Sequence, residues 1–202
     1  MGSNCFSTKK TPSSCTPSGS QNIRTLSAFV ADFRNHCAAG EFEEIKFFQD
    51  QPSFDLAINC AALAINADGK RYSHQCLIRR TAIPQALDTL RQNKNLLASS
   101  SSFDELHSIL HSVLHQIYGV GELYIYDTAL RLGAFLELFP EKIYLHAGTR
   151  VGAFALGLNV SAGVLEISDF PEPIRSLQPH EIESFLCVYK DDIKKLMANK
   201  TA

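Results

Sequence analysis

The sequence lacks the features that mark several large classes of protein. Its longest apolar run, Leu56–Ile65, contains Asn59 and falls short of the ~20 residues that span a membrane. The six cysteines show neither CxxC spacing nor the histidine spacing of a zinc module. The formal net charge is −2, so a surface for nucleic acid must be a local patch. We therefore expect a cytoplasmic protein with free thiols, no membrane partner, no metal and no cofactor.

Hydrophobic residues make up 45% of the chain, which is enough for a core, and they recur mainly at helical spacing. Residues 1–21 are rich in Ser, Thr and Pro, which predicts a disordered tail before one helical domain over residues 22–202. The predicted fold class is mostly α, as a single orthogonal helical domain. Residues 164–167 favour either a short strand or an extended strap. Helix boundaries are indicated at Gly40, Ser53, Pro84, Ser102 and Pro179.

The chain is organised around residues 102–158. Ser102 followed by Glu105 matches a capping box, and an apolar face follows at helical spacing. Gly119 predicts the helix stop, because glycine accepts a left-handed backbone without steric cost, and Gly121 allows a tight turn into a second helix. The first N–H groups of that second helix would attract anions. The block therefore predicts two helices joined by a hairpin at Gly119–Gly121.

An apolar helix that ends in Ile-Tyr-Gly-Val-Gly and runs into a second helix resembles the helix-hairpin-helix motif, especially that of the helix-hairpin-helix DNA glycosylases. The resemblance implies that backbone N–H groups at Gly119, Val120 and Gly121 hold a DNA phosphate. That family continues with a short apolar stretch and a helix bearing an arginine, and Lys142–Leu158 has similar spacing, with Arg150 at the matching position. The resemblance covers about a quarter of the chain.

The catalytic residues of that family do not carry over. A bifunctional glycosylase has its nucleophilic lysine just after the hairpin, where this chain has Glu122 and Leu123, and Leu145–Ala147 contains no catalytic aspartate. Because Schiff-base chemistry needs an amine and base excision needs a carboxylate, glycosylase activity is not expected. DNA binding without catalysis is the leading hypothesis. The YDTALR and YLHAGTR blocks also resemble a family of uncharacterised bacterial proteins, which adds no function.

The most basic stretch of the chain follows the Asp68-Gly69 turn. Beside a phosphate-binding hairpin it would give sequence-independent affinity for nucleic acid through counterion release. The alternative is a solvated helix face, where Lys and Arg are common. Only the nucleic-acid interpretation requires this stretch to lie beside the hairpin in the folded chain. The residues concerned are Lys70, Arg71, Arg79 and Arg80.

A second glycine-containing segment predicts another anion site. Gly148 permits a tight turn, Thr149 can cap the helix that carries Arg150, and His146 is a titratable donor. Arg150 would grip a phosphate with two N–H groups. The alternative is a turn whose His146 and Arg150 satisfy buried backbone carbonyls.

Two other arrangements are open to a chemical interpretation. Asp127 and Arg131 lie four residues apart, which predicts an ion pair along a helix, or a site shared with Tyr124 or Tyr126. An enzyme built on this scaffold would use Asp127 and His146 as acid and base in a pocket. A third possibility is a structural or partner-binding protein whose hairpin only packs.

Three histidines recur on one helical stripe, four residues apart. Such a stripe brings imidazoles within reach of a shared metal, but no cysteine or carboxylate follows at matching spacing. We expect a solvated or groove-lining face there instead. The three are His107, His111 and His115.

Overall fold

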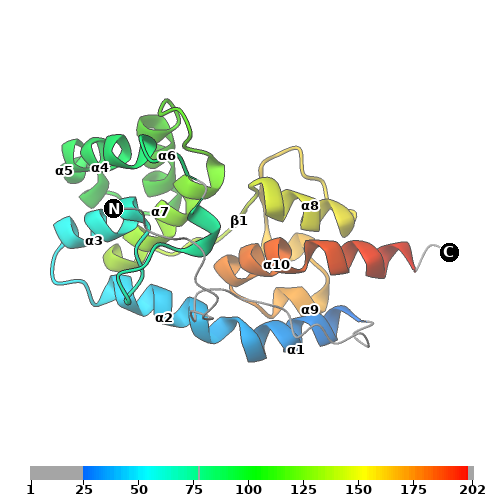
Figure 1. The fold of residues 1–202 in the computed structure, drawn as a ribbon. Helices are drawn as coiled ribbons and strands as arrows, with labels where there is room; N and C mark the ends of the chain where they lie inside the picture. The colour runs from blue at the N-terminus through cyan, green and yellow to red at the C-terminus, as the bar shows by residue number, and fades with distance from the viewer. Residues whose placement is uncertain (1–24, 77, 200–202) are drawn as a thin grey trace. The chain divides into compact units, whose positions relative to one another are not determined.

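The computed structural model describes residues 25–76 and 78–199, so the predicted tail lies outside the described residues. Within these ranges the chain is predominantly helical, which confirms the predicted class. The chain divides into two compact units (Figure 1). The first contains residues 42–139 and the second joins residues 25–41 to 140–199. A single domain over residues 22–202 stays a prediction. No helix in the described ranges is long and apolar enough to cross a membrane.

The first unit is built from helices that pack in pairs. Helix α3 packs on α4 and α7, and α6 packs on α4, α5 and α7. A short 3-10 helix, η1 (Ser73–Gln75), follows α3. The helices are α3 (Phe54–Leu63), α4 (Ala82–Gln92), α5 (Lys94–Ala98), α6 (Phe103–Leu114) and α7 (Glu122–Leu136).

Ser102 caps the start of α6 as the sequence predicts, but the Glu105 carboxylate bonds to Ser101 and not to Ser102. Ser102 Oγ accepts the N–H of Glu105 at 3.2 Å. The Glu105 carboxylate reaches back to Ser101, whose N–H and hydroxyl donate to it at 2.8 Å each. These bonds stabilise the ionised carboxylate and lower the pKa of Glu105. Helix α6 ends at Leu114, so residues 115–121 form a longer connection than a stop at Gly119 predicts.

The second unit centres on its long last helix. Helix α10 (Pro179–Ala198) packs along α8 (Ala147–Ala155) and also contacts α1 (Leu26–His36). The rings of Phe33 and Phe185 meet edge to face, with centroids 5.9 Å apart. Helix α9 (Glu172–Arg175) packs on α1, and the 3-10 helix η2 spans Ile167–Asp169. Residues 164–165 do form a strand: β1 (Ile143–Tyr144) pairs antiparallel with β2 (Val164–Leu165).

The predicted helix stop at Gly40 is wrong. Helix α2 (Ala38–Gln49) runs through Gly40, and the break from α1 falls at Cys37. A glycine inside a helix costs about 1 kcal/mol relative to alanine, which tertiary packing readily overrides.

The cysteines partly match the prediction of free thiols. Cys60, Cys76 and Cys187 are not disulfide-bonded, and burial raises the pKa of the Cys60 thiol. Cys37 is disulfide-bonded, so the prediction is wrong at this position.

Candidate nucleic-acid interface

The connection between α6 and α7 forms an exposed hairpin. Gly119 has φ 98°, a left-handed value that favours glycine. The N–H of Val120 donates to the carbonyl of Ile117 at 3.0 Å, so this predicted amide is used within the turn. Gly121 is extended (φ −116°, ψ 174°), a conformation that any residue adopts, and α7 begins after it without a side-chain cap. The positive end of the α7 dipole therefore lies at Gly121 and the first turn of the helix.

Arg79 from the basic stretch packs on this hairpin. A Cβ added at Gly119 would lie 3.0 Å from Arg79 Cδ. The Arg79 guanidinium sits 4.3 Å over the ring of Tyr118 and donates to its hydroxyl at 3.0 Å. Arg79 is exposed, and Tyr118 is 74% exposed. We call residues Arg79 and Tyr118–Gly121 the hairpin surface.

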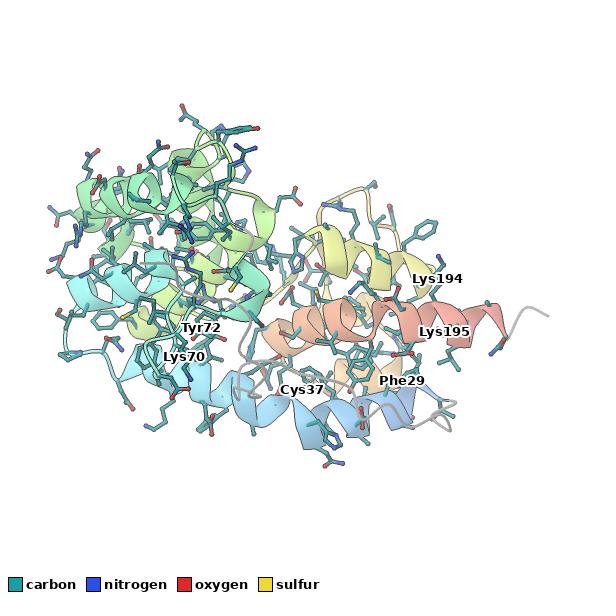
Figure 2. All side chains as sticks on the ribbon, viewed as in Figure 1. Phe29, Cys37, Lys70, Tyr72, Lys194 and Lys195 are labelled. Atoms are coloured by element: carbon teal, nitrogen blue, oxygen red, sulfur yellow. The ribbon has the colours of Figure 1, made fainter. Side chains whose placement is uncertain are left out.

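The other three predicted basic residues differ in how they are held. Arg80 is exposed, and so is Lys70, which Figure 2 labels beside Tyr72 on the segment after α3. Arg71 is half-buried and its Nε donates to the carbonyl of Leu63 at 3.3 Å. Glu122, the first residue of α7, places an exposed carboxylate next to the hairpin. The hairpin therefore has charges of both signs beside it: Arg79 contacts Gly119, and the carboxylate of Glu122 follows Gly121 directly.

The second predicted anion site has a different geometry. Helix α8 already begins at Ala147, so Gly148 lies in its first turn and not in a turn before it. Thr149 is fully buried, and its Oγ1 accepts the N–H of His146 at 3.0 Å. Arg150 donates to the carbonyls of Val160 and Leu145, at 2.8 and 2.7 Å. For Arg150 these are the bonds expected of the alternative, in which it satisfies backbone carbonyls.

Helix α10 covers the beginning of α8. A Cβ added at Gly148 would lie 2.6 Å from Cys187 Sγ. The His146 imidazole is paired through Nε2 with the carboxylate of Glu183, and both side chains are buried. A carboxyl group of the protein itself therefore lies at this corner. Phosphate binding by Thr149 and Arg150 stays a prediction, and the hairpin surface is the more accessible of the two segments.

Arg131 is the centre of a buried polar cluster in the first unit. Its Nη2 lies 3.8 Å from Asp127 Oδ2, which confirms the predicted ion pair. Its Nε donates to Glu44 Oε1 at 2.9 Å and its Nη1 to Gln75 Oε1 at 3.0 Å. The guanidinium also lies 4.2 Å over the ring of Tyr72. Burial, together with the nearby Glu44 carboxylate, raises the pKa of Tyr72.

Asp127 is held from two further sides. His74 Nε2 lies 2.9 Å from Asp127 Oδ2, and the amide of Gln75 donates to the same oxygen. The His74 side chain is 40% exposed and that of Asp127 is 13% exposed. The structure thus gives Asp127 a histidine neighbour that sequence reasoning missed, since His74 lies 53 positions away. His146 belongs to the second unit.

The two tyrosines predicted to share a site with Asp127 are structural. Tyr124 is buried and donates to the carbonyl of Ala62 at 2.7 Å. Burial raises the pKa of Tyr124 to about 12, so its hydroxyl stays protonated at neutral pH. Tyr126 is also buried and packs edge to face on Phe103. Neither ring is placed to share an accessible site with Asp127.

The histidine stripe lies along α6. His107 stacks on Phe103, and burial lowers the pKa of His107 to about 4. His111 and His115 are exposed and stack on each other. Among the residues with described positions, no three or more His, Cys, Asp or Glu side chains are grouped to hold a metal ion. A solvated face, one of the two predicted alternatives, fits the exposed His111 and His115, whereas His107 is half-buried.

Comparison with protein-family models, curated proteins and solved structures gives no match for this chain. The class that the fold itself defines is therefore broad, a mostly helical protein with a small two-stranded sheet. The helix-hairpin-helix interpretation rests on the sequence of residues 102–158, which the two units divide after Phe139, and it stays a prediction.

Proposed function

We propose that the hairpin surface binds the phosphate backbone of DNA, without chemistry on the bases. The observation that carries the proposal is the contact of Arg79 with Gly119. It joins the most basic stretch of the sequence to the hairpin that resembles a phosphate-binding motif. A solvated helix face, the alternative considered for Arg79, does not by itself account for this contact.

The chemistry of the hairpin surface suits a phosphodiester. Arginine presents N–H groups in a planar fork that matches two phosphate oxygens. The uncapped start of α7 adds backbone N–H groups and the positive end of a 15-residue helix. Such contacts position a protein on the nucleic acid but do not read its sequence. We therefore expect binding that depends little on base composition.

The Arg79–Tyr118 stack prepares the arginine for this contact. Stacking on the ring fixes the guanidinium, and an arginine that is already ordered loses less side-chain freedom on binding. The bond to the Tyr118 hydroxyl uses Nη2, so other N–H groups of the fork can face a phosphate. The exposed Arg80, next to Arg79 in the chain, adds a cation that releases counterions when the backbone approaches.

The test is the anisotropy of a fluorescent DNA duplex titrated with the full chain at several salt concentrations. Arg79→Gln removes one phosphate contact, so we expect weaker binding to every sequence and a slope of log K against log salt shallower by about one. The matched control is Arg91→Gln, since Arg91 is an exposed arginine of the same unit that is bonded to Asn59. Glu122→Gln removes the carboxylate beside the hairpin and should strengthen binding.

Two results would count against DNA binding at this surface. One is affinity independent of salt, which phosphate contacts cannot produce. The other is an equal loss of affinity in Arg79→Gln and Arg91→Gln, since only Arg79 contacts the hairpin.

A second candidate function is acid–base catalysis at His74. The favouring observation is the 2.9 Å contact of His74 Nε2 with Asp127, whose carboxylate Gln75 and Arg131 also hold. A carboxylate held in this way can orient an imidazole as a general base. A product formed from DNA by the wild type but not by His74→Gln would favour this candidate. DNA binding without turnover in both proteins favours the first.

A further inference from the structure

The exposed end of α6 carries two histidines in a defined arrangement. His111 lies in the last turn of α6, and His115 is the C-cap residue one turn later. Their ring centroids are 5.2 Å apart and their planes differ by 7°. Both side chains are exposed. Residues four apart on a helix face the same side, so neither ring has to leave the helix surface to reach a shared ligand.

A backbone contact fixes the proton on His115. Its Nδ1 lies 2.8 Å from the carbonyl oxygen of His111. Because a carbonyl oxygen only accepts, the Nδ1 must carry the proton, which leaves the lone pair of neutral His115 on Nε2. Histidines that ligate metals usually hold their other ring nitrogen on a carbonyl or carboxylate in this way.

The spacing of the two rings fits a shared metal ion. Zn–N bonds of about 2.0–2.1 Å at a tetrahedral angle place two imidazole centres about 5 Å apart. The observed separation is 5.2 Å, although the rings are parallel. The His115 ring keeps its contact with the carbonyl of His111, and rotation of the His111 ring about χ2, a broad torsion in histidine, turns one of its nitrogens towards the side of His115 Nε2 without moving the backbone.

We propose that His111 and His115 form a binding site for a divalent late transition-metal ion. Imidazole nitrogens suit Ni²⁺, Cu²⁺ and Zn²⁺, in the order of affinity that places Cu²⁺ highest. Since the described residues supply no third protein ligand in place, water completes the coordination and positions stay open to an external ligand. The site is independent of the proposed DNA binding, because Arg79 and the hairpin glycines take no part in it.

The test is calorimetric titration of the untagged full chain with Ni²⁺ alone, without reductant, so that the disulfide of Cys37 stays intact. We expect His111→Ala and His115→Ala each to lower the Ni²⁺ affinity about tenfold or more, because either change leaves one imidazole in place of a chelating pair. Alanine favours the helix and both positions are exposed, so the variants should keep the helical circular dichroism of the wild type.

The matched control is His36→Ala. His36 is another exposed histidine in the last turn of a helix, and its Nδ1 also lies on a backbone carbonyl, that of Asp32, at 2.9 Å. Ni²⁺ affinity should stay unchanged in this variant. Equal affinity in wild type, His111→Ala and His115→Ala would overturn the proposal, and so would the absence of binding by the wild type at about millimolar Ni²⁺, well above the range expected of a chelating pair.

Discussion

Replacing Arg131 by methionine should destabilise the first unit more than any other single arginine substitution in it. The guanidinium is buried and has four neighbours: Glu44, Gln75, Asp127 and the ring of Tyr72. Methionine fills similar space without a charge or a donor. It therefore leaves a carboxylate at Glu44, another at Asp127 and the amide oxygen of Gln75 without their shared donor.

The magnitude follows from the bonds that are lost. Removing one partner of a buried ion pair typically costs about 3–5 kcal/mol, because the remaining charge stays poorly solvated. Glu44 and Asp127 retain some contact with solvent, with side chains 24% and 13% exposed, which favours the lower half of that range. The expected loss is therefore about 3–4 kcal/mol of unfolding free energy.

The assay is urea unfolding followed by circular dichroism, since the chain has no tryptophan. With a urea dependence of about 2 kcal/mol per molar, the midpoint of the first unit should fall by about 1.5–2 M. The control is Arg91→Met, which removes an exposed arginine bonded to Asn59 and should cost less than about 1 kcal/mol.

A second comparison isolates the cause of the loss. If stranded carboxylates are responsible, neutralising both in the methionine background (Glu44→Gln with Asp127→Asn) should recover part of the stability. A loss in Arg131→Met no larger than in Arg91→Met would refute this reasoning. An unchanged loss after neutralisation would show that packing, and not charge, holds the cluster together.

Three smaller predictions concern pH and glycine. The folded-state pKa of His107 is lowered from 6.5 to about 4, so the unfolded chain binds more protons in that window and stability falls as pH falls from 6.5 to 4. His107→Leu should make urea unfolding less sensitive to pH across this window. Gly152→Ala would place a Cβ 2.5 Å from the carbonyl oxygen of Leu186, so it should push α8 from α10 and cost about 1–3 kcal/mol in thermal unfolding. Gly119→Ala should destabilise by about 1–2 kcal/mol because φ is 98°, whereas Gly121→Ala, with extended backbone and open space, should be neutral in the same assay.

Local signals predicted the structure well where the interacting residues are close in sequence. Ser102 caps α6 through a bond that spans three residues, and Pro179 begins α10. The ion pair of Asp127 with Arg131 spans four residues along α7. In each case the spacing alone determines that the groups meet.

Contacts between distant residues could not be predicted in the same way. Glu44 reaches Arg131 across 87 positions, and Glu183 reaches His146 across 37. No local pattern marks either pair, because the meeting depends on how helices pack. The same limit explains why the sequence predicted the ion pair of Asp127 with Arg131 but not the burial of Arg131 at the centre of a cluster.

The two glycines of the hairpin illustrate a similar limit. The sequence assigned a conformational role to both Gly119 and Gly121, but only Gly119 has a left-handed φ. Arg79 was one candidate within a basic stretch, and its packing on Gly119 became visible only in the folded unit. Composition indicated the stretch, and the structure shows which of its residues contacts the hairpin.

The most direct test of the DNA-binding proposal is to map, by NMR, the chemical-shift changes of the backbone amides in the full chain when a short DNA duplex is added. We predict that the largest shift changes fall on Gly119, Gly121 and the first turn of α7, with smaller changes in the first turn of α8, where Glu183 pairs with His146. Arg79→Gln should reduce the changes at the hairpin. Changes centred on α8 and Arg150, or no change at the hairpin at low salt, would contradict the account.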